Sequence, residues 1–224
     1  MRRNVSLRWE DPKLRWAEEV ASSIRYLHRA QRFDNHTLSY TMGIVHRDIK
    51  TTNILIDAMF VSKITDFGES VDRADKEKLG IVGTPKFVAP EVMKGLNYGF
   101  KADVYSYGIV LSELATGKKP YHDFDGISLT REIMHGLRPT VPKKRISSAL
   151  RSLMEHCWDA NPKTRPTMDE VIEVLQHIDT TNFATEETVR VAEVEPEQQI
   201  ESYSVGTDSR EETTDALQAQ PGTS

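Results

Sequence analysis

Residues 46–53, HRDIKTTN, decide the fold of this chain. They are followed by the triplet DFG at 66–68, and that triplet is followed by APE at 89–91. Two short β-type runs, 54–56 and 60–64, lie between the first two motifs and predict a β-hairpin. A hairpin returns the chain toward its start, so it would bring the DFG triplet back beside the HRD loop.

Periodic apolar residues predict helices on both sides of these motifs. A helix over 12–29 has Asp11 as its expected N-cap and a proline at its first position. The run 102–116 is apolar on nearly every face, which is typical of a buried helix, and Gly117 follows it as a helix stop. We therefore expect 102–116 to be the central helix of the domain.

Two further helices are predicted near the end of the folded part. An apolar stripe marks a helix over 150–158, and Cys157 lies on that stripe, so we expect it in the core and not as a nucleophile. A capping box that begins at Thr167 predicts the last helix, which continues to Ile178. Residues 1–179 should thus be mainly helical, an α+β domain with one small β element. The segment about 30–42 is expected to be a polar loop.

The charge of the chain is divided unevenly along its length. The net charge is −5, but residues 180–224 carry 10 acidic and 2 basic residues, a balance of −8, which leaves +3 on 1–179. The end segment is too poor in apolar residues to form a core, so we expect an acidic disordered tail that signalling partners could bind. The small positive balance of 1–179 gives no reason to expect nucleic-acid binding.

No apolar run is long enough to span a membrane. Residues 1–11 have no apolar core of the kind that a signal peptide carries, so we expect no secretory signal. The single cysteine cannot form an internal disulfide, which agrees with a reducing compartment. We therefore expect a cytoplasmic location, although this does not exclude a longer membrane-bound parent.

The ordered motifs resemble the C-terminal lobe of a eukaryotic protein kinase, over about residues 10–179. Cys157-Trp158 and the triplet 165–167 (RPT) are similar to the tyrosine-kinase and tyrosine-kinase-like groups. Lys50, two residues after Asp48, and Gly83-Thr84 are typical of serine/threonine kinases. The resemblance implies a tyrosine-kinase-like Ser/Thr kinase that uses ATP and Mg²⁺ and acts on protein substrates.

The resemblance also assigns roles to single residues. Asp48 would orient the substrate hydroxyl, and Lys50 would lie against the transferring phosphate. Asn53 and Asp66 would offer oxygen ligands to Mg²⁺, a hard cation. Thr84 would dock the protein substrate. Taken singly, acidic and amide residues of this kind are ordinary turn formers; the ordered pattern favours the catalytic interpretation.

Further positions would bind nucleotide or support the site. Leu55 would lie under the adenine ring. The resemblance implies structural roles for His46, Arg47, Phe67, Glu91, Asp103 and Arg165. Among these we expect a buried ion pair between Glu91 and Arg165 and hydrogen bonds from the HRD backbone to Asp103. His46 lacks a second His or Cys at metal-ligand spacing, so it should be structural.

The segment after the DFG triplet should be the activation segment. Residues 71–83 contain no Ser, Thr or Tyr but do contain acidic residues. In this family the arginine before the catalytic aspartate often pairs with a phosphate on this segment. We therefore expect Asp75 or Glu77 to partner Arg47 in place of a phosphate.

The N-terminal lobe of the family is expected to be absent. The sequence contains no G-x-G-x-x-G motif and nothing that matches the lysine of the third kinase strand. The segment from Arg32 to Met42 is either a genuine surface insertion or an error in how the coding sequence was assigned. Two interpretations stay open: a fragment of a longer active kinase, or a non-catalytic C-lobe that acts as a protein-interaction module.

Overall fold

The structure is a computed structural model. It describes residues 12–34, 38–72, 80, 82–124, 126–143 and 146–178. All of them lie in the first of two units, residues 1–190, whereas the second unit, 191–224, lies outside the described residues. The predicted acidic tail over 180–224 therefore also lies outside them and stays a prediction.

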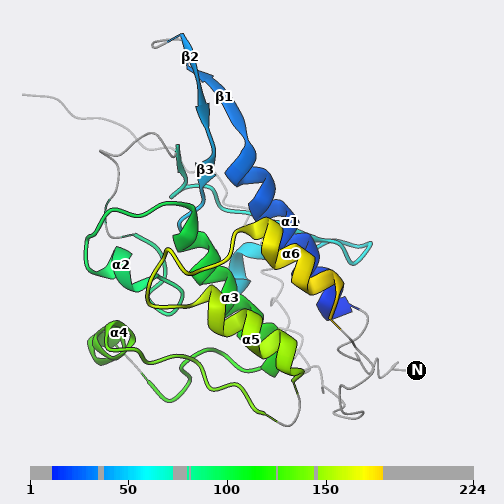
Figure 1. The fold of residues 1–224 in the computed structure, drawn as a ribbon, viewed down its shortest axis with the longest axis vertical. Helices are drawn as coiled ribbons and strands as arrows, with labels where there is room; N and C mark the ends of the chain where they lie inside the picture. The colour runs from blue at the N-terminus through cyan, green and yellow to red at the C-terminus, as the bar shows by residue number, and fades with distance from the viewer. Residues whose placement is uncertain are drawn as a thin grey trace, which may run out of the picture. The chain divides into compact units, whose positions relative to one another are not determined.

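The described residues form short helices and paired strands (Figure 1). The helices are α1 (Leu14–Arg29), α2 (Pro90–Met93), α3 (Phe100–Thr116), α4 (Gly126–Met134), α5 (Ser148–Cys157) and α6 (Met168–Gln176). The strands are β1 (Gln31–Asp34), β2 (Ser39–Met42), β3 (Ile44–Val45), β4 (Ile54–Ile56), β5 (Ser62–Ile64) and β6 (Val71–Asp72). They pair antiparallel as β1 with β2, β3 with β6, and β4 with β5. The expectation of one small β element is wrong, because two-residue strands such as β3 and β6 leave no alternation to detect.

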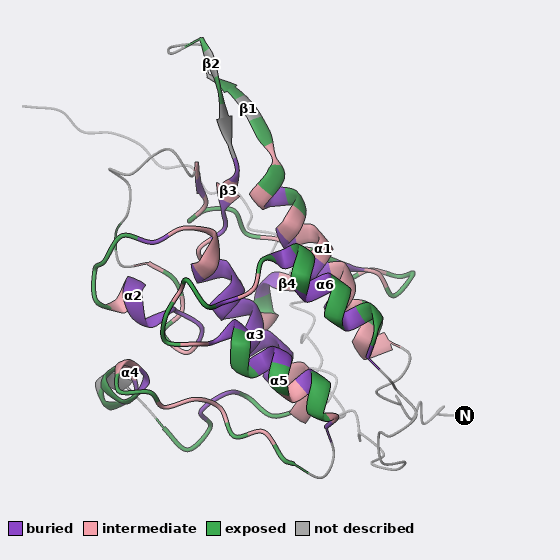
Figure 2. Cartoon of the chain, in the orientation of Figure 1, coloured by how far each residue is buried: buried purple, intermediate pink, exposed green. Residues whose placement is uncertain are grey.

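Helix α3 is the centre of the described fold, as its sequence predicts. Every residue from Ala102 to Ser112 is buried, and Figure 2 shows α3 as the most continuously buried helix in view. Its polar residues have partners: Ser106 Oγ, for example, donates to the carbonyl of Phe87 over 2.8 Å. Gly117 ends the helix in the left-handed conformation, with φ of 67°, and its N–H donates to the carbonyl of Glu113.

The other predicted helices pack around this centre. Helix α1 buries one face through Ala17, Val20, Ala21, Ile24 and Leu27. Helices α1 and α6 lie side by side, and α5 packs against α3 (Figure 1). The capping box of α6 is confirmed: the Thr167 side chain accepts from the Glu170 N–H, and the Glu170 carboxylate accepts from the Thr167 N–H. The expected N-cap of α1, Asp11, lies outside the described residues.

Helices α3 and α5 approach each other closely at Gly108. A Cβ atom at this position would lie 2.7 Å from Cβ of Cys157, so a glycine is required there. Cys157 is buried, as predicted, and burial raises the pKa of its thiol to about 12. The thiol is therefore neutral at physiological pH and belongs to the core.

The hairpin between the HRD and DFG motifs is confirmed. Strands β4 and β5 pair with Ile54 opposite Ile64 and Leu55 opposite Lys63. The second strand begins at Ser62, later than predicted, because Asp57 caps the turn. Its Oδ1 atom accepts from the N–H groups of Met59, over 2.9 Å, and Val61, over 3.0 Å.

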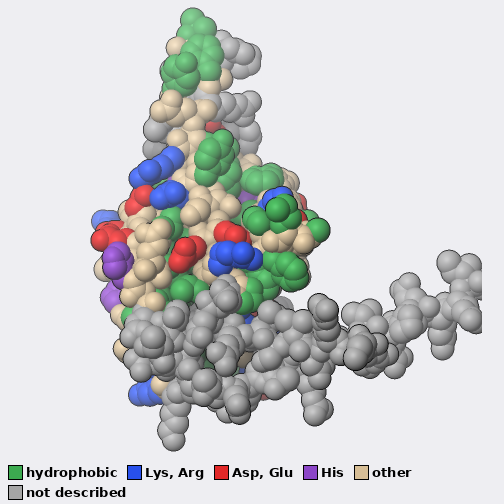
Figure 3. All heavy atoms as spheres, turned by 90° about the vertical axis from the view of Figure 1, so that its right-hand side faces the viewer, with side chains coloured by type: hydrophobic (Ala, Val, Ile, Leu, Met, Phe, Trp, Pro, Cys, Tyr) green, Lys and Arg blue, Asp and Glu red, His purple; other side chains and the backbone are tan. Residues whose placement is uncertain are grey.

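The segment expected to be a polar loop is instead an antiparallel ribbon, β1–β2. Phe33 lies opposite Tyr40 in its register, and their rings meet edge to face with centroids 5.1 Å apart. Cross-strand aromatic pairs of this kind stabilise a ribbon. The strands were not predicted because most residues around this pair are polar. Leu38, near the turn, is also exposed, and Figure 3 shows hydrophobic side chains gathered at the far end of the ribbon.

No helix in the described part of the chain is both long and apolar enough to cross a membrane.

A buried ion pair connects distant parts of the chain. Both terminal nitrogens of the Arg165 guanidinium donate to the Glu91 carboxylate, over 2.6 and 2.8 Å. Arg165 also donates to the carbonyls of Asp159 and Lys101. Glu91 lies in α2 and Arg165 precedes α6, so this pair joins the end of the activation segment to the loop before the last described helix.

We predict that Glu91→Leu lowers the free energy of unfolding by about 3–5 kcal/mol, because it leaves the Arg165 guanidinium buried without its counter-charge. The double variant E91L/R165M should recover most of this loss. Urea unfolding followed by circular dichroism measures both. The exposed pair of Asp169 with Arg29, at 2.8 Å, is the control, and Asp169→Asn should cost less than about 1 kcal/mol. A cost of Glu91→Leu no larger than that of this control would contradict the prediction.

Candidate active site

The HRD loop is held by one carboxylate from α3. Oδ2 of Asp103 accepts from the His46 N–H and Oδ1 accepts from the Arg47 N–H, each over 2.9 Å. Arg47 adopts the left-handed conformation, with φ of 70°, which a side chain with a Cβ disfavours. The two hydrogen bonds from successive amides fix this turn and thereby the position of Asp48.

His28 is a third partner of Asp103 that the sequence did not identify. Its Nε2 atom lies 3.0 Å from Oδ2 of Asp103, and its ring stacks on Phe100 with centroids 4.5 Å apart. His28 occupies the last turn of α1, which is the helix that leads toward the loop. The sequence shows only that His28 lies near the end of a predicted helix. Its contact with Asp103 depends on the tertiary fold.

Three predicted site residues, Lys50, Asn53 and Thr84, meet at the Asp48 carboxylate. Nζ of Lys50 lies 2.6 Å from Oδ2 of Asp48, and Nδ2 of Asn53 lies 3.1 Å from the same oxygen. Thr84 donates to Oδ1 through its N–H, over 3.0 Å, and its hydroxyl, over 2.9 Å. Lys50 also donates to the Thr84 hydroxyl, over 2.9 Å. The catalytic loop and the activation segment are therefore joined at Asp48.

The electrostatic balance at Asp48 favours the ionised form. Burial acts to raise the pKa of the Asp48 carboxyl, but the hydrogen bonds from Lys50 and Thr84 and the charge of Lys50 together outweigh it. The pKa of Asp48 consequently lies below its ordinary value, and the group is a carboxylate at neutral pH.

Asn53 and Asp66 stand at the start and the end of the β4–β5 hairpin. The Thr65 N–H donates to the Asn53 carbonyl over 2.9 Å, so the residue before Asp66 is tied to Asn53. Asp66 is exposed and left-handed, with φ of 64°, and accepts a long bond of 3.4 Å from the Gly68 N–H. The structure thus brings the backbones of both predicted metal ligands together.

The donor atoms of these two residues suit a hard cation. The Asn53 amide nitrogen donates to the carbonyl and the carboxylate of Asp48, and no described residue donates to the Asn53 amide oxygen. An amide oxygen and a nearby carboxylate are ligands that Mg²⁺ accepts. Among the described residues no cluster of three or more His, Cys, Asp or Glu could hold a metal, so a cation here would depend on this mixed pair.

Phe67 and Leu55 both present apolar surface to solvent. Phe67 is 50% exposed and Leu55 is 56% exposed. The ring of the buried His46 lies 5.0 Å from that of Phe67, and its Nε2 atom is 3.2 Å from the Thr65 carbonyl. A shallow hollow of about 440 Å³ is lined in part by Tyr26 and Phe67.

Arg47 contacts an acidic residue that the sequence did not indicate. Its Nε atom donates to the Glu69 carbonyl, and one of its terminal nitrogens lies 3.9 Å from the Glu69 carboxylate. Another donates to the Tyr98 hydroxyl over 3.3 Å. The partners expected for Arg47, Asp75 and Glu77, lie outside the described residues, so that hypothesis stays a prediction.

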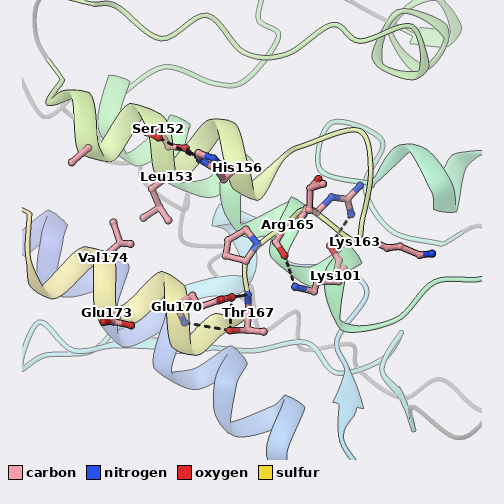
Figure 4. Close-up of a pocket in the computed structure, with 13 residues that line it drawn as sticks. Lys101, Ser152, Leu153, His156, Lys163, Arg165, Thr167, Glu170, Glu173 and Val174 are labelled. Atoms are coloured by element: carbon pink, nitrogen blue, oxygen red, sulfur yellow. Dashed lines mark hydrogen bonds between the residues drawn. The ribbon is translucent and has the colours of Figure 1, made fainter.

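The hollow in Figure 4 does not belong to this site. It measures about 750 Å³, lies between α5 and α6, and shares no lining residue with the Asp48 cluster. Its polar groups bond one another: Lys101 donates to the Arg165 carbonyl, and the His156 ring lies 2.7 Å from the Ser152 carbonyl. These polar groups therefore have partners in the surrounding backbone, and the hollow is a groove without a polar cluster like that at Asp48.

We predict that Asp103→Ala lowers the free energy of unfolding by about 3 kcal/mol, because it removes a buried acceptor from two amides. Hydrogen exchange should accelerate most at the His46 and Arg47 amides. Ser112→Ala is the matched control, since this buried hydroxyl of α3 donates within its own helix, to Ile109 over 2.7 Å. Unchanged protection of the two amides in Asp103→Ala would contradict the assigned role.

Comparison with known proteins gives a consistent result. The family model "Protein kinase domain" matches residues 2–177. A probable serine/threonine-protein kinase of Dictyostelium discoideum is 34% identical over 166 residues, which cover 73% of this chain and 17% of that protein. A protein of Acanthamoeba polyphaga mimivirus, named as a serine/threonine-protein kinase/receptor, is 38% identical over 166 residues, which cover 74% and 10%.

The dual specificity protein kinase shkC of Dictyostelium discoideum is 36% identical over 173 residues, which cover 74% of this chain and 32% of that protein. The chain spans less than a third of the length of these three relatives. Because the HRD, DFG and APE motifs occur in order and the family model matches residues 2–177, the chain belongs to the protein kinase family.

Proposed function

We propose that this chain is the C-terminal lobe of a serine/threonine protein kinase of the tyrosine-kinase-like group. The observation that supports this most is the Asp48 carboxylate, which lies within hydrogen-bond distance of Lys50, Asn53 and Thr84. Lys50 and Thr84 are the residues that favour Ser/Thr over Tyr. The names of the aligned relatives agree with this specificity at the level of the family.

The proposed reaction transfers the γ-phosphate of ATP to a protein hydroxyl. Asp48, ionised and fixed, orients the hydroxyl and accepts its proton, while the Lys50 ammonium neutralises charge on the transferred group. Asn53 and Asp66 would hold Mg²⁺, whose charge would offset that of the phosphates. Leu55 offers apolar surface to the adenine ring. Thr84, bonded to both Asp48 and Lys50, positions the substrate chain beside the carboxylate.

The second candidate is a non-catalytic module that binds other proteins. The exposed apolar side chains of Phe67 and Leu55 favour it, because exposed apolar surface commonly marks a binding site. The retained Asp48 cluster favours descent from an active enzyme. A cytoplasmic location and signalling partners for the acidic tail complete the proposal; they are supported by the single buried cysteine and by the tail composition.

We predict that the 224-residue chain alone does not phosphorylate a generic protein in Mg-ATP, because it contains no glycine-rich loop and no third-strand lysine. A longer version with an N-terminal lobe should phosphorylate serine and threonine. In that version Asp48→Asn should reduce the rate by about 10²–10⁴-fold. Transfer of labelled phosphate from ATP measures both.

Lys143→Gln, an exposed change outside the Asp48 cluster, is the control and should leave the rate unchanged. Phosphorylation by the chain alone that Asp48→Asn abolishes would contradict the first expectation. A folded longer version without activity would favour the interaction module over the enzyme.

A further inference from the structure

Hydrogen bonds join the catalytic loop and the activation segment to the end of α3 and to the loop after it, so these segments form one surface. The Thr51 hydroxyl, in the catalytic loop, donates to Glu113 near the end of α3 over 2.9 Å. Nζ of Lys86, two residues after Thr84, donates to the Tyr121 carbonyl over 3.3 Å. The catalytic loop is therefore tied to the end of α3, and the activation segment is tied to the loop that follows α3.

This surface is rich in lysine. Lys50 lies at Asp48 itself, Lys86 lies on the activation segment, and Lys118 and Lys119 follow the end of α3. Lys118 and Lys119 are exposed, and the Lys118 N–H donates to the Thr116 hydroxyl over 3.2 Å, which fixes the turn that carries them. In the described part of the chain, none of Lys86, Lys118 and Lys119 lies within ion-pair distance of a carboxylate.

Acidic groups near these lysines do not cancel their charge. The Asp48 carboxylate is already occupied by Lys50, Thr84 and Asn53. Glu113 is partly buried, and its burial raises its pKa despite the Thr51 hydrogen bond and the nearby Lys119 and Lys86 charges. Asp123 lies 3.1 Å from the His122 ring. Counting Lys86, Lys118 and Lys119 against the carboxylates of Glu113 and Asp123 leaves one positive charge on the described part of this surface.

We propose that Lys86, Lys118 and Lys119 select protein segments in which acidic residues flank the phosphoacceptor hydroxyl. This inference rests on the proposed kinase function, since it names the substrate class of that site. Ammonium groups without an ion-pair partner on this surface would attract aspartate and glutamate and repel basic segments. Lys86 lies two residues after Thr84, which bonds Asp48, and the charges of Lys86 and Lys119 both act on Glu113. The patch is small, which favours a peptide over a nucleic acid, since a nucleic acid would need a long basic stripe.

The test is peptide binding to the 224-residue chain, measured by fluorescence anisotropy without nucleotide. Two labelled serine peptides of equal length are compared, one flanked by glutamates and one by lysines. At low ionic strength the acidic peptide should bind about tenfold more tightly, and added salt should reduce this preference. The double variant K118E/K119E should abolish or reverse it. K143E/K163E, which changes the same charge at two exposed lysines elsewhere, should preserve it.

The inference is overturned if the two peptides bind equally, if the acidic peptide does not bind, or if K143E/K163E removes the preference as fully as K118E/K119E. It is also overturned if a single-stranded oligonucleotide binds more tightly than the acidic peptide. The assay contains no nucleotide, so its outcome is separate from phosphoryl transfer. A preserved preference in a protein that never phosphorylates would refute the kinase proposal alone, whereas phosphorylation without preference would refute only the charge selection.

Discussion

The candidate site depends on the Asp103 carboxylate, which accepts hydrogen bonds from two backbone amides. Asp103 lies in the first turn of the central helix α3 and is fully buried. A buried carboxylate is costly unless donors surround it, and here the His46 and Arg47 amides and the His28 ring do so. Because Arg47 is held in a disfavoured conformation, loss of these bonds would release the turn that places Asp48. The helix core and the reactive loop are therefore stabilised by the same contact.

Contacts other than those of Asp103 fix the activation segment. Ser106 of α3 donates to the Phe87 carbonyl, and Glu91 pairs with Arg165. These contacts hold the chain just after Thr84, so Thr84 can reach Asp48 although the two residues are far apart in sequence. The Asp48 carboxylate is consequently paired within the chain, whereas the Asn53 amide oxygen accepts no hydrogen bond from the described residues. Phe67 and Leu55 stay exposed to solvent.

Local patterns predicted the elements whose cause is local. The apolar run that became α3, the capping box at Thr167 and the β4–β5 hairpin each follow from neighbouring residues, and motif spacing placed Asp48, Lys50 and Asn53 in one loop. The β1–β2 ribbon was missed because its stability depends on a cross-strand pair, Phe33 with Tyr40, within a polar stretch. His28 at Asp103 and Glu69 at Arg47 were missed for a related reason: only the packed fold brings them together. Sequence thus predicts residue types at a site better than the partners that hold them.

Fold and recognition use different residues on this surface, which makes them separable. Asp103, Glu91 and Arg165 are buried and bonded, so changing them alters the scaffold before it alters any ligand contact. Lys118 and Lys119 are exposed, and in the described residues no ion pair engages either of them. An exposed ammonium without a partner adds little to stability, so the fold does not account for two adjacent lysines at this position. The charges of Lys119 and Lys86 act on Glu113 within the folded chain, and the exposed Lys118 and Lys119 would also attract an acidic segment that approaches this surface.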